Sequence, residues 1–543
     1  MQSRRDQVQA YSFTVGRLTS GMLAADPDAL DTPMSRTRRG AVVGFFIGLL
    51  LCVGFTVFGL IFPRDSDNWR EPGVLIMEKE TGARYLYGDG VLRPVLNYTS
   101  AKLVTGKSGK VEQVSRATLA DVPRGAPIGI PGAPDSLPSA DQLTTAAWQV
   151  CATTRVADDG TREATTTVGV GTGTAAGSSP LGVDEGLLVT AGDGKRRTDH
   201  LLWRGRRLRL DAEHGALQSL GYGTTEPLAV GAAFLSAVPA GPDLAAPEVA
   251  GRGGKGPTLA GERRRVGQYF VVRTPGSAEQ YYLLDRAGLV PLSLTELQLL
   301  RGDPRTRKDA YAGQEPTAVE LQPDEAGRHL AAADGEAGTS TRSATTATST
   351  TTATATTASG ALPSGPPKAF TPRTGTVPCL AVTPDGATPR GTFVEVPAAY
   401  ATGGAVVARE GVAPGCPAPE LIGVRPGRGV LVMPASTSGS VGAGTSGARY
   451  LVTGDGIKYP LSAPAVAGQL SYADTHLVRL PPALLRLLPT GPVLDPERAA
   501  QAALSGPAPA VPDPECGGAE TQEKKDTKEP KETKETKEGR KTR

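Results

Sequence analysis

One stretch of the chain has the residue types that could hold a nucleotide phosphate. Residues 101–108, Ala-Lys-Leu-Val-Thr-Gly-Lys-Ser, fit a relaxed phosphate-loop pattern in which Ala101 replaces the first glycine. A phosphate loop follows a buried strand, and its glycine-rich turn surrounds the phosphates with backbone amides. Here Asn-Tyr-Thr-Ser precedes the pattern, so Gly106, Lys107 and Ser108 are weak candidates for nucleotide binding. The alternative is a helix that ends at Gly106 and leaves Lys107 in solvent.

No other part of the sequence has an active-site pattern. The chain lacks a CxxC pair and a GxSxG nucleophile motif, and no paired carboxylates stand out. The histidines are isolated from one another: His200, His214, His329 and His476. The sequence therefore predicts no catalytic residue, no metal site and no cofactor.

The cysteines suggest where disulfides could form. Cys52 lies inside an apolar run and is explained as a small apolar residue there. The other four all follow that run: Cys151, Cys379, Cys416 and Cys516. In an oxidising compartment, an even number of cysteines predicts up to two disulfides, with three possible pairings.

The apolar run, residues 41–62, sets the position of these groups relative to a membrane. It carries no charge, and as a helix it is long enough to cross a hydrocarbon core of about 30 Å. Arg36, Arg38 and Arg39 precede it, whereas basic and acidic residues are mixed after it. Because an excess of arginine marks the cytoplasmic end, residues 1–40 are predicted inside the plasma membrane and residues from 63 onward outside it. A cleaved signal peptide is the alternative, but its apolar region would be shorter and would end at a better cleavage site.

A helix is predicted before the span. Residues 7–23 place apolar side chains at spacings of three and four: Val8, Tyr11, Val15, Leu18 and Met22. This amphipathic helix could pack on the membrane surface or on a cytoplasmic protein. Arg17 is its only basic residue past the start, which favours a protein partner over lipid.

The composition after the span indicates a large, extended protein. Among 543 residues there are 68 glycines and 46 prolines, while aromatic residues make up 5%, so much of the chain is turn and linker. The net charge of +3 comes from nearly balanced acids and bases, and it gives no general attraction to nucleic acid.

One pattern recurs after the span. A Tyr-Leu strand, a glycine turn and a second strand predict a β-hairpin at three places: residues 85–95, 282–292 and 450–461. A weaker copy runs from Leu187 through Gly194 and Lys195 to Leu208. Stretches with helical spacing follow three copies: residues 101–104, 294–300 and 477–488. A closing Val-Pro-x-Gly or Leu-Pro-x-Gly occurs at three places: residues 122–125, 238–241 and 488–491. We therefore predict four copies of a hairpin-plus-helix module.

Two segments between the copies predict a further β domain. Residues 150–170 and 378–432 are rich in Val, Thr and Gly and include Cys151 and Cys379, which would join the two halves of the ectodomain if they paired. The predicted fold is α+β and β-rich, with a single N-terminal transmembrane helix and an elongated ectodomain of four repeats around this central β domain. In order, the predicted segments are a cytoplasmic helix (1–40), the span (41–62), repeat 1 (63–147), the first part of the β domain (148–182), repeat 2 (183–250), repeat 3 (262–325), a disordered Thr/Ala/Ser insert (335–370), the second part of the β domain (375–440), repeat 4 (445–505) and a disordered Lys/Glu tail (517–543).

The chain resembles the EccB family, the single-pass core membrane component of type VII (ESX) secretion systems. The resemblance covers residues 7–500, outside the Thr-rich insert. It rests on specific phrases, of which the longest are Arg-Pro-Val-Leu-Asn-Tyr-Thr-Ser-Ala-Lys-Leu and Pro-Arg-Gly-Ala-Pro-Ile-Gly-Ile-Pro-Gly-Ala-Pro. These phrases are residues 93–103, 123–134, 148–151, 238–247 and 450–459.

The resemblance implies one disulfide, by position Cys151 to Cys379, within four repeats around a central β domain. It also implies assembly with the EccC-type motor ATPase, EccD and EccE near a mycosin protease, with self-association through the ectodomain. The repeats look like cell-wall-binding modules, so peptidoglycan is a further expected contact. Cys416 and Cys516 are additional to the family's pair, and a second disulfide between them is our own inference. The N-terminal helix is also less charged than the family pattern.

The function predicted from these observations is a membrane-anchored structural scaffold of a type VII secretion complex, driven by a partner's energy. One alternative is a nucleotide hydrolase in the same system, since some family members are labelled ATPases. It would need Lys107 and Ser108 at a phosphate. Another alternative is a cell-wall-binding membrane anchor without a secretion partner.

Overall fold

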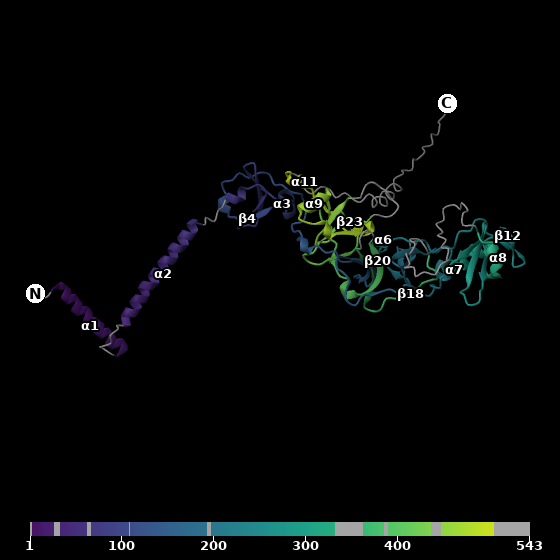
Figure 1. The fold of residues 1–543 in the computed structure, drawn as a ribbon, viewed down its shortest axis with the longest axis horizontal. Coiled ribbons are helices and arrows are strands. Elements are labelled where there is room, and N and C mark those ends of the chain that lie inside the picture. Colours follow the sequence, from purple (N-terminus) through teal and green to yellow (C-terminus); the bar gives the residue numbers. More distant parts are fainter. Residues whose placement is uncertain are drawn as a thin grey trace, which may run out of the picture.

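The computed structural model describes residues 3–25, 33–61, 67–107, 109–192, 197–331, 362–384, 389–435 and 447–503. The molecule is elongated, with two helices at one end and a series of small sheets extending away from them (Figure 1). The predicted mixed, β-rich α+β fold is confirmed. Most of the predicted Thr/Ala/Ser insert and all of the predicted Lys/Glu tail lie outside the described residues.

The two helices at the N-terminal end are α1 (Arg4–Ala24) and α2 (Pro33–Ile61). Within α2, Thr37–Phe58 is long and apolar enough to cross a membrane, and it is the one such segment in the described residues. In α1 the predicted apolar residues are exposed, as is Phe13 on the opposite side of the helix. Helix α1 is therefore less one-sided than the sequence spacing indicated.

Within the described residues, four sheets share one topology, and we call the segments that contain them units 1 to 4 (residues 74–125, 185–241, 269–330 and 430–491). Three antiparallel strands are followed by a helix, then by a fourth strand parallel to the first, and then by a second helix. The elements of unit 1 are β1 (Val74–Glu78), β2 (Arg84–Gly88), β3 (Val91–Pro94), α3 (Tyr98–Thr105), β4 (Lys110–Val114) and α4 (Arg116–Leu119). Those of unit 2 are β8 (Glu185–Ala191), β9 (Thr198–Trp203), β10 (Arg206–Arg209), α5 (Ala216–Ser219), β11 (Leu228–Ala229) and α6 (Ala232–Ala237).

Units 3 and 4 repeat this order. The elements of unit 3 are β14 (Tyr269–Val272), β15 (Gln280–Asp285), β16 (Gly288–Leu292), α7 (Leu294–Gly302), β17 (Val319–Leu321) and α8 (Pro323–Arg328). Those of unit 4 are β23 (Val430–Pro434), β24 (Arg449–Val452), β25 (Lys458–Leu461), α9 (Pro464–Gln469), β26 (Leu477–Leu480) and α10 (Pro482–Leu487). In each unit the segment after the second helix returns to the third strand through a parallel bridge: Leu92 to Arg124, Arg207 to Ala240, Leu289 to Leu330 and Lys458 to Thr490.

The structure differs from the sequence prediction in two of the units. In unit 2 the hairpin equivalent to the others is β9–β10, whose turn residues Arg204 and Gly205 both have positive φ, as a type I′ turn requires. The sequence instead placed the turn at Gly194 and Lys195, which lie outside the described residues. In unit 4, residues 477–488 form a strand and then a helix rather than one helix, because Pro481 and Pro482 interrupt the segment between them.

A seven-stranded sheet lies between the units and brings together the two β-rich segments of the sequence. Its order is β21-β22-β6-β5-β19-β20-β7. The strands are β5 (Trp148–Val156), β6 (Arg162–Val170), β7 (Ser179–Pro180), β19 (Thr376–Thr383), β20 (Arg390–Pro397), β21 (Gly404–Ala405) and β22 (Leu421–Val424). Cys151 of β5 is opposite Cys379 of β19, and the two form a disulfide with an S–S distance of 2.08 Å. The implied pair is confirmed.

The units are not arranged along the molecule in sequence order. Figure 1 shows unit 1 next to α2, then unit 4, then the central sheet with unit 2, and unit 3 at the far end. Helix contacts join the neighbours: α3 packs on α9 and on α11 (Pro496–Ala500), α6 on α10, and α5 on α7. The largest apolar cluster is at the centre and combines the seven-stranded sheet with units 2 and 4. The chain thus runs out to unit 3 and returns.

The remaining elements are short. Strands β12 (Lys255–Leu259) and β13 (Glu262–Arg265) form a hairpin attached to unit 3. Strand β18 (Lys368–Phe370) pairs with β8, so the end of the predicted Thr/Ala/Ser insert is ordered, because its last residues complete the sheet of unit 2. Short 3-10 helices are η1 (Asp67–Arg70), η2 (Ala140–Gln142), η5 (Ala398–Tyr400) and η6 (Asp474–His476), and η4 (Thr306–Ala310) is a short π-helix.

Candidate functional site: the joints between the units

The phosphate-loop-like residues lie at the C-terminal end of a helix. Helix α3 is capped at its start by Asn97, whose side chain accepts a hydrogen bond from the Ser100 amide at 2.9 Å, and Gly106 is the residue after its end. A phosphate loop has the reverse order, with its glycines before a helix N-terminus whose amides face the anion. Helix C-termini present carbonyl oxygens, which repel phosphate. Lys107 is exposed, and Ser108 lies outside the described residues.

At the centre of the molecule, a cation holds the second helix of units 2 and 4. Arg207 of β10 donates to the Leu235 carbonyl of α6 at 2.8 Å, and Lys458 of β25 donates to the Leu485 carbonyl of α10. Both cations occupy the bridge position of the third strand, and both meet the negative end of a helix dipole. Burial lowers the pKa of Arg207. Helices α6 and α10, which pack on each other, are therefore each held to the third strand of their own unit by a cation from that strand.

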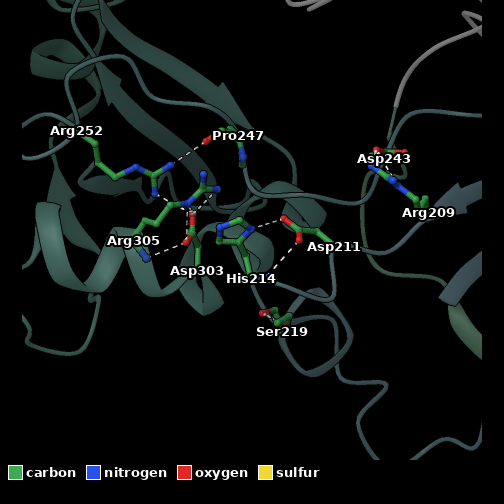
Figure 2. A network of polar contacts seen from close by, with 10 residues as sticks. Arg209, Asp211, His214, Ser219, Asp243, Pro247, Arg252, Asp303 and Arg305 are labelled. Atoms are coloured by element: carbon green, nitrogen blue, oxygen red, sulfur yellow. Dashed lines mark hydrogen bonds and ion pairs between the residues drawn. The ribbon is translucent and has the colours of Figure 1, made fainter. Parts of the chain in front are cut away.

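The joint between units 2 and 3 contains a buried ion network (Figure 2). Asp303, at the end of α7, is fully buried and accepts from Arg252 at 3.0 Å and from Arg305 at 3.1 Å. Arg252 also donates to the Pro247 carbonyl, at 3.2 Å, and to Thr306. The guanidinium of Arg252 thus ties the segment that leaves unit 2 to the helix of unit 3. A buried carboxylate is tolerated when it is paired and hydrogen-bonded in this way.

An Asp–His pair lies beside this network. His214 Nδ1 and Asp211 Oδ2 are 2.7 Å apart, and the His214 amide also donates to Asp211. Burial alone would raise the pKa of Asp211, but these hydrogen bonds outweigh it and hold the pKa below its usual value. An Asp–His pair can orient a base for a nucleophile, but the Ser219 hydroxyl in Figure 2 donates to the Gly215 carbonyl instead. The Asp211–His214 pair closes the turn that precedes α5, and these three residues have no hydrolytic geometry.

Helices α5 and α7 approach each other closely at this joint. A Cβ atom added to Gly302 would lie 1.7 Å from Ser219 Oγ and 2.6 Å from Ser219 Cβ. Leu299 of α7 is buried in the apolar cluster of unit 2. The joint therefore combines a narrow helix contact with the ion network, and it requires glycine at residue 302.

Metal-binding clusters and clefts are the other places where the described residues could hold a ligand. No group of three or more metal-ligating side chains occurs among them. A cleft of about 470 Å³ between the central sheet and unit 4 is lined mainly by glycine backbone and aliphatic side chains and is bordered by the ion pair of Arg409 and Asp455, at 3.0 Å.

The sequence did not identify the residues of the joints. Arg252 and Asp303 are 51 positions apart, and no local pattern relates them. Arg207 and Lys458 could have been found by aligning the third strands of copies 2 and 4, since each precedes a closing Pro-x-Gly by a similar interval. Trp69 and Trp148 are buried, so both pack in the interior.

Comparison with known proteins identifies the chain. The model of the family described as "Type VII secretion system ESX-1, transport TM domain B" matches residues 1–505. The chain belongs to this family. The EccB resemblance inferred from the sequence is therefore confirmed across nearly the whole chain.

Individual EccB relatives match part of the chain. The ESX-3 secretion system ATPase EccB3 of Mycolicibacterium smegmatis is 29% identical over 327 residues, which are 60% of this chain and 60% of the relative. The ESX-2 secretion system ATPase EccB2 of Mycobacterium tuberculosis is 33% identical over 249 residues, 45% of this chain and 48% of the relative. The chain thus spans less than two thirds of the length of these curated relatives.

Solved EccB structures have the same fold. A chain of the EccB3 dimer from the ESX-3 core complex superposes with a TM-score of 0.57 at 25% identity, covering 79% of this chain and 100% of that one. A chain of an intact ESX-5 inner membrane complex superposes with a TM-score of 0.58 at 22% identity, covering 94% of this chain and 98% of that one.

Proposed function

We propose that the chain is a membrane-anchored scaffold subunit of a type VII secretion complex. Helix α2 crosses the plasma membrane, α1 is cytoplasmic, and the four units with the central sheet stand outside. The chain holds other components in place, and a partner supplies the energy for transport. The observation that carries the proposal is the fold match to the EccB3 dimer over 79% of the chain.

The architecture supports a scaffold for a physical reason. Neighbouring units are joined by helix contacts and a shared apolar core. Within the central sheet, a disulfide joins β5 and β19 through cysteines that are 228 residues apart in sequence. Such joints restrict bending, so the ectodomain transmits position along its length. The proposed partners are an EccC-type motor ATPase, EccD, EccE and a mycosin protease, with a second copy of this chain at the ectodomain. Contact with peptidoglycan is proposed for the outer surface.

The test is purification of the tagged full chain in a mild, uncharged detergent, followed by mass spectrometry of the proteins that co-elute. We expect a large complex containing a motor ATPase and a multi-span membrane protein. Recovery of the chain alone from intact membranes, with binding to isolated peptidoglycan, would contradict the scaffold and support a cell-wall anchor.

A second candidate function is nucleotide hydrolysis, because the matched relatives are named ATPases. It would require Lys107 at a phosphate. We expect the purified chain to hydrolyse no ATP, and Lys107→Ala to behave like the control Lys110→Ala, which removes another exposed lysine nearby. Hydrolysis that is lost in Lys107→Ala and kept in Lys110→Ala would establish the enzyme instead.

The proposed orientation can be tested with single cysteines in a Cys52→Ser background. Thr161 is exposed at the turn between β5 and β6, and Ser3 is exposed before α1. We expect a membrane-impermeant maleimide to label Thr161→Cys on intact cells and to label Ser3→Cys only after permeabilisation. The reverse pattern would contradict the topology.

We also propose a second disulfide between Cys416 and Cys516. Cys416 is disulfide-bonded, whereas Cys52 is free and Cys151 is joined to Cys379. Cys516 lies outside the described residues. Peptide mapping without reduction should yield a linked Cys416–Cys516 peptide, and alkylation of Cys516 before reduction would refute it.

A further inference from the structure

The hairpin β12–β13 at the far end of the molecule has an unusual distribution of charge. Lys255 is directly opposite Arg265, and Arg263 is two residues before Arg265 on the same strand. Residues opposite each other, or two apart on a regular strand, share a face of the sheet. The pairing shifts register between Lys255 and Thr258, which places the extra residue on β12 and leaves Arg263 and Arg265 two apart on β13, so the three side chains project from the same face. All three are exposed. Among the described residues, none of the three has an ion pair.

The other face of the hairpin is fixed to unit 3. Leu259 is fully buried in the apolar cluster of that unit. Arg264 donates to the Leu259 carbonyl at 3.0 Å and pairs with Glu262 at 2.9 Å, and Glu325 of α8 accepts from the Ala260 amide at 2.9 Å. The nearby acidic side chains Glu262 and Glu325 are thus engaged away from the charged face. The hairpin holds its cations outward on a supported ribbon.

This charge distribution is unfavourable in the protein alone. Like charges directly opposite each other on neighbouring strands destabilise a sheet, and Lys255 and Arg265 are such a pair. Arginines on other hairpins have partners: Arg209 pairs with Asp243 at 2.7 Å, and Arg155 with Glu163 at 2.7 Å. An anion bound across the face would relieve the repulsion.

We infer that this face, Lys255, Arg263 and Arg265, binds a linear polyanion of the cell envelope that carries phosphate groups. Arg263 and Arg265 are about 7 Å apart along the strand and Lys255 is about 5 Å across from Arg265, so neighbouring anionic groups of one extended chain can contact all three. Guanidinium groups bind phosphate through two hydrogen bonds at once. The hairpin lies at the end opposite α2 in Figure 1, away from the lipid that surrounds the span.

A protein partner fits this face less well. Protein interfaces have an apolar centre with charged residues at the rim. Within residues 255–265 the one large apolar side chain is Leu259, and it is buried. The exposed face therefore presents charged side chains and backbone groups to a partner, without a large apolar side chain.

The test measures binding of fluorescently labelled inorganic polyphosphate to the full chain in an uncharged detergent, by anisotropy. The variant Lys255→Ser/Arg263→Ser/Arg265→Ser should weaken binding about tenfold and reduce the slope of log affinity against log salt by about 2, since each lost contact contributes about 0.7. The control Lys79→Ser/Lys110→Ser/Arg162→Ser removes the same charge from exposed positions elsewhere and should bind like the parent chain.

Arg263→Gln provides a milder variant that leaves the Lys255–Arg265 pair intact, and it should reduce the salt slope by about a third of the triple effect. Equal weakening in the triple variant and its control, or none in either, would overturn the inference. Tighter binding of poly-glutamate than of polyphosphate through the same side chains would instead assign the face to an acidic polypeptide. The biological setting rests on the proposed outside location of the units, which maleimide labelling tests separately from this binding measurement.

Discussion

The centre of the four-unit part of the chain and its far tip are joined to the rest of the molecule in different ways. At the centre, the seven-stranded sheet and units 2 and 4 share one apolar cluster that includes Trp148, Phe234 and Leu484. At the tip, unit 3 meets unit 2 through Leu299, a close helix contact at Gly302 and the buried ion network of Asp303. The centre thus depends on apolar area, whereas the tip depends on geometry and paired charge. We expect the two to fail independently, because the apolar residues of the centre and of the tip belong to different clusters.

The largest effect is expected from Phe234→Ala at the centre. Phe234 is fully buried where α6 packs against the sheet, and truncating such a side chain costs about 3–5 kcal/mol. In thermal unfolding of the full chain, the transition that belongs to the central sheet should be lost. In limited proteolysis, both β-rich segments should be cut faster than in the parent chain. Phe234→Leu, which keeps most of the volume, should cost less than about 1.5 kcal/mol. Equal effects of the two variants would show that the centre is not close-packed there.

Asp303→Asn should loosen the tip and leave the centre intact. It removes the charge that pairs with Arg252 and Arg305, and breaking a buried pair in this way costs about 3 kcal/mol. Limited proteolysis should cut between units 2 and 3 while the central disulfide-linked fragment persists. Asp243→Asn breaks an exposed pair and should cost at most about 1 kcal/mol. Unfolding of all four units in Asp303→Asn would show that tip and centre are coupled.

Gly302→Ala should disturb the same joint by crowding. The added methyl group would lie against Ser219 of α5, so α5 and α7 must separate, at a cost of about 1–3 kcal/mol. Gly327 in α8 has open space around it, and Gly327→Ala should be neutral or slightly stabilising. Hydrogen exchange should rise at α5 and α7 in the first variant alone.

The smallest effect is expected from acid at the centre. Glu395 accepts from Arg373 and Thr376, and although burial opposes it, these bonds lower the pKa of Glu395 to about 2. A lowered folded-state pKa stabilises the fold above the unfolded value near 4.5 and loses that contribution as the pH falls towards 2. Because Arg373 is largely exposed, water screens part of the interaction, and we expect about 1–2 kcal/mol.

The measurement for this last prediction is the melting temperature of the parent chain and of Glu395→Gln from pH 6 to pH 2.5. The difference between them should shrink as the pH falls. If the difference in melting temperature stays constant with pH, Glu395→Gln acts through altered packing and not through loss of the carboxylate charge.

Local signals explain what could be predicted from the sequence. The span and the hairpins of units 1, 3 and 4 follow from apolar length and from glycine turns such as Gly90, which are set by neighbouring residues. The first and fourth strands of each unit are direct parallel neighbours, but two strands and a helix separate them in the sequence. No local pattern therefore predicted the pairing of β1 with β4. The same reasoning explains β18, which is a strand only because β8 offers it an edge.

The residues of the joints were harder to predict than the fold. The disulfide followed from family resemblance and not from spacing. The ion network of Asp303 and the contact of Gly302 with Ser219 form only when units 2 and 3 meet, and nothing in either segment alone requires them. The basic strand of β13, with three consecutive arginines, could have been noticed, but the face on which each arginine lies depends on its register with β12.

The path of the chain out to unit 3 and back has a consequence for the order in which the protein can fold during synthesis. Strands β5 and β6 precede unit 3, whereas their neighbours β19 and β22 follow it. If the chain emerges from the translocation channel from its N-terminal side, unit 1 and unit 3 can form from contiguous segments as they appear. Strands β5 and β6 can pair with each other at once, but the outer edge of each stays open until β19 and then β22, which ends at residue 424, have passed. Exposed strand edges favour wrong pairing, so we expect the four-unit part of the chain to be most vulnerable to aggregation and proteolysis during this interval.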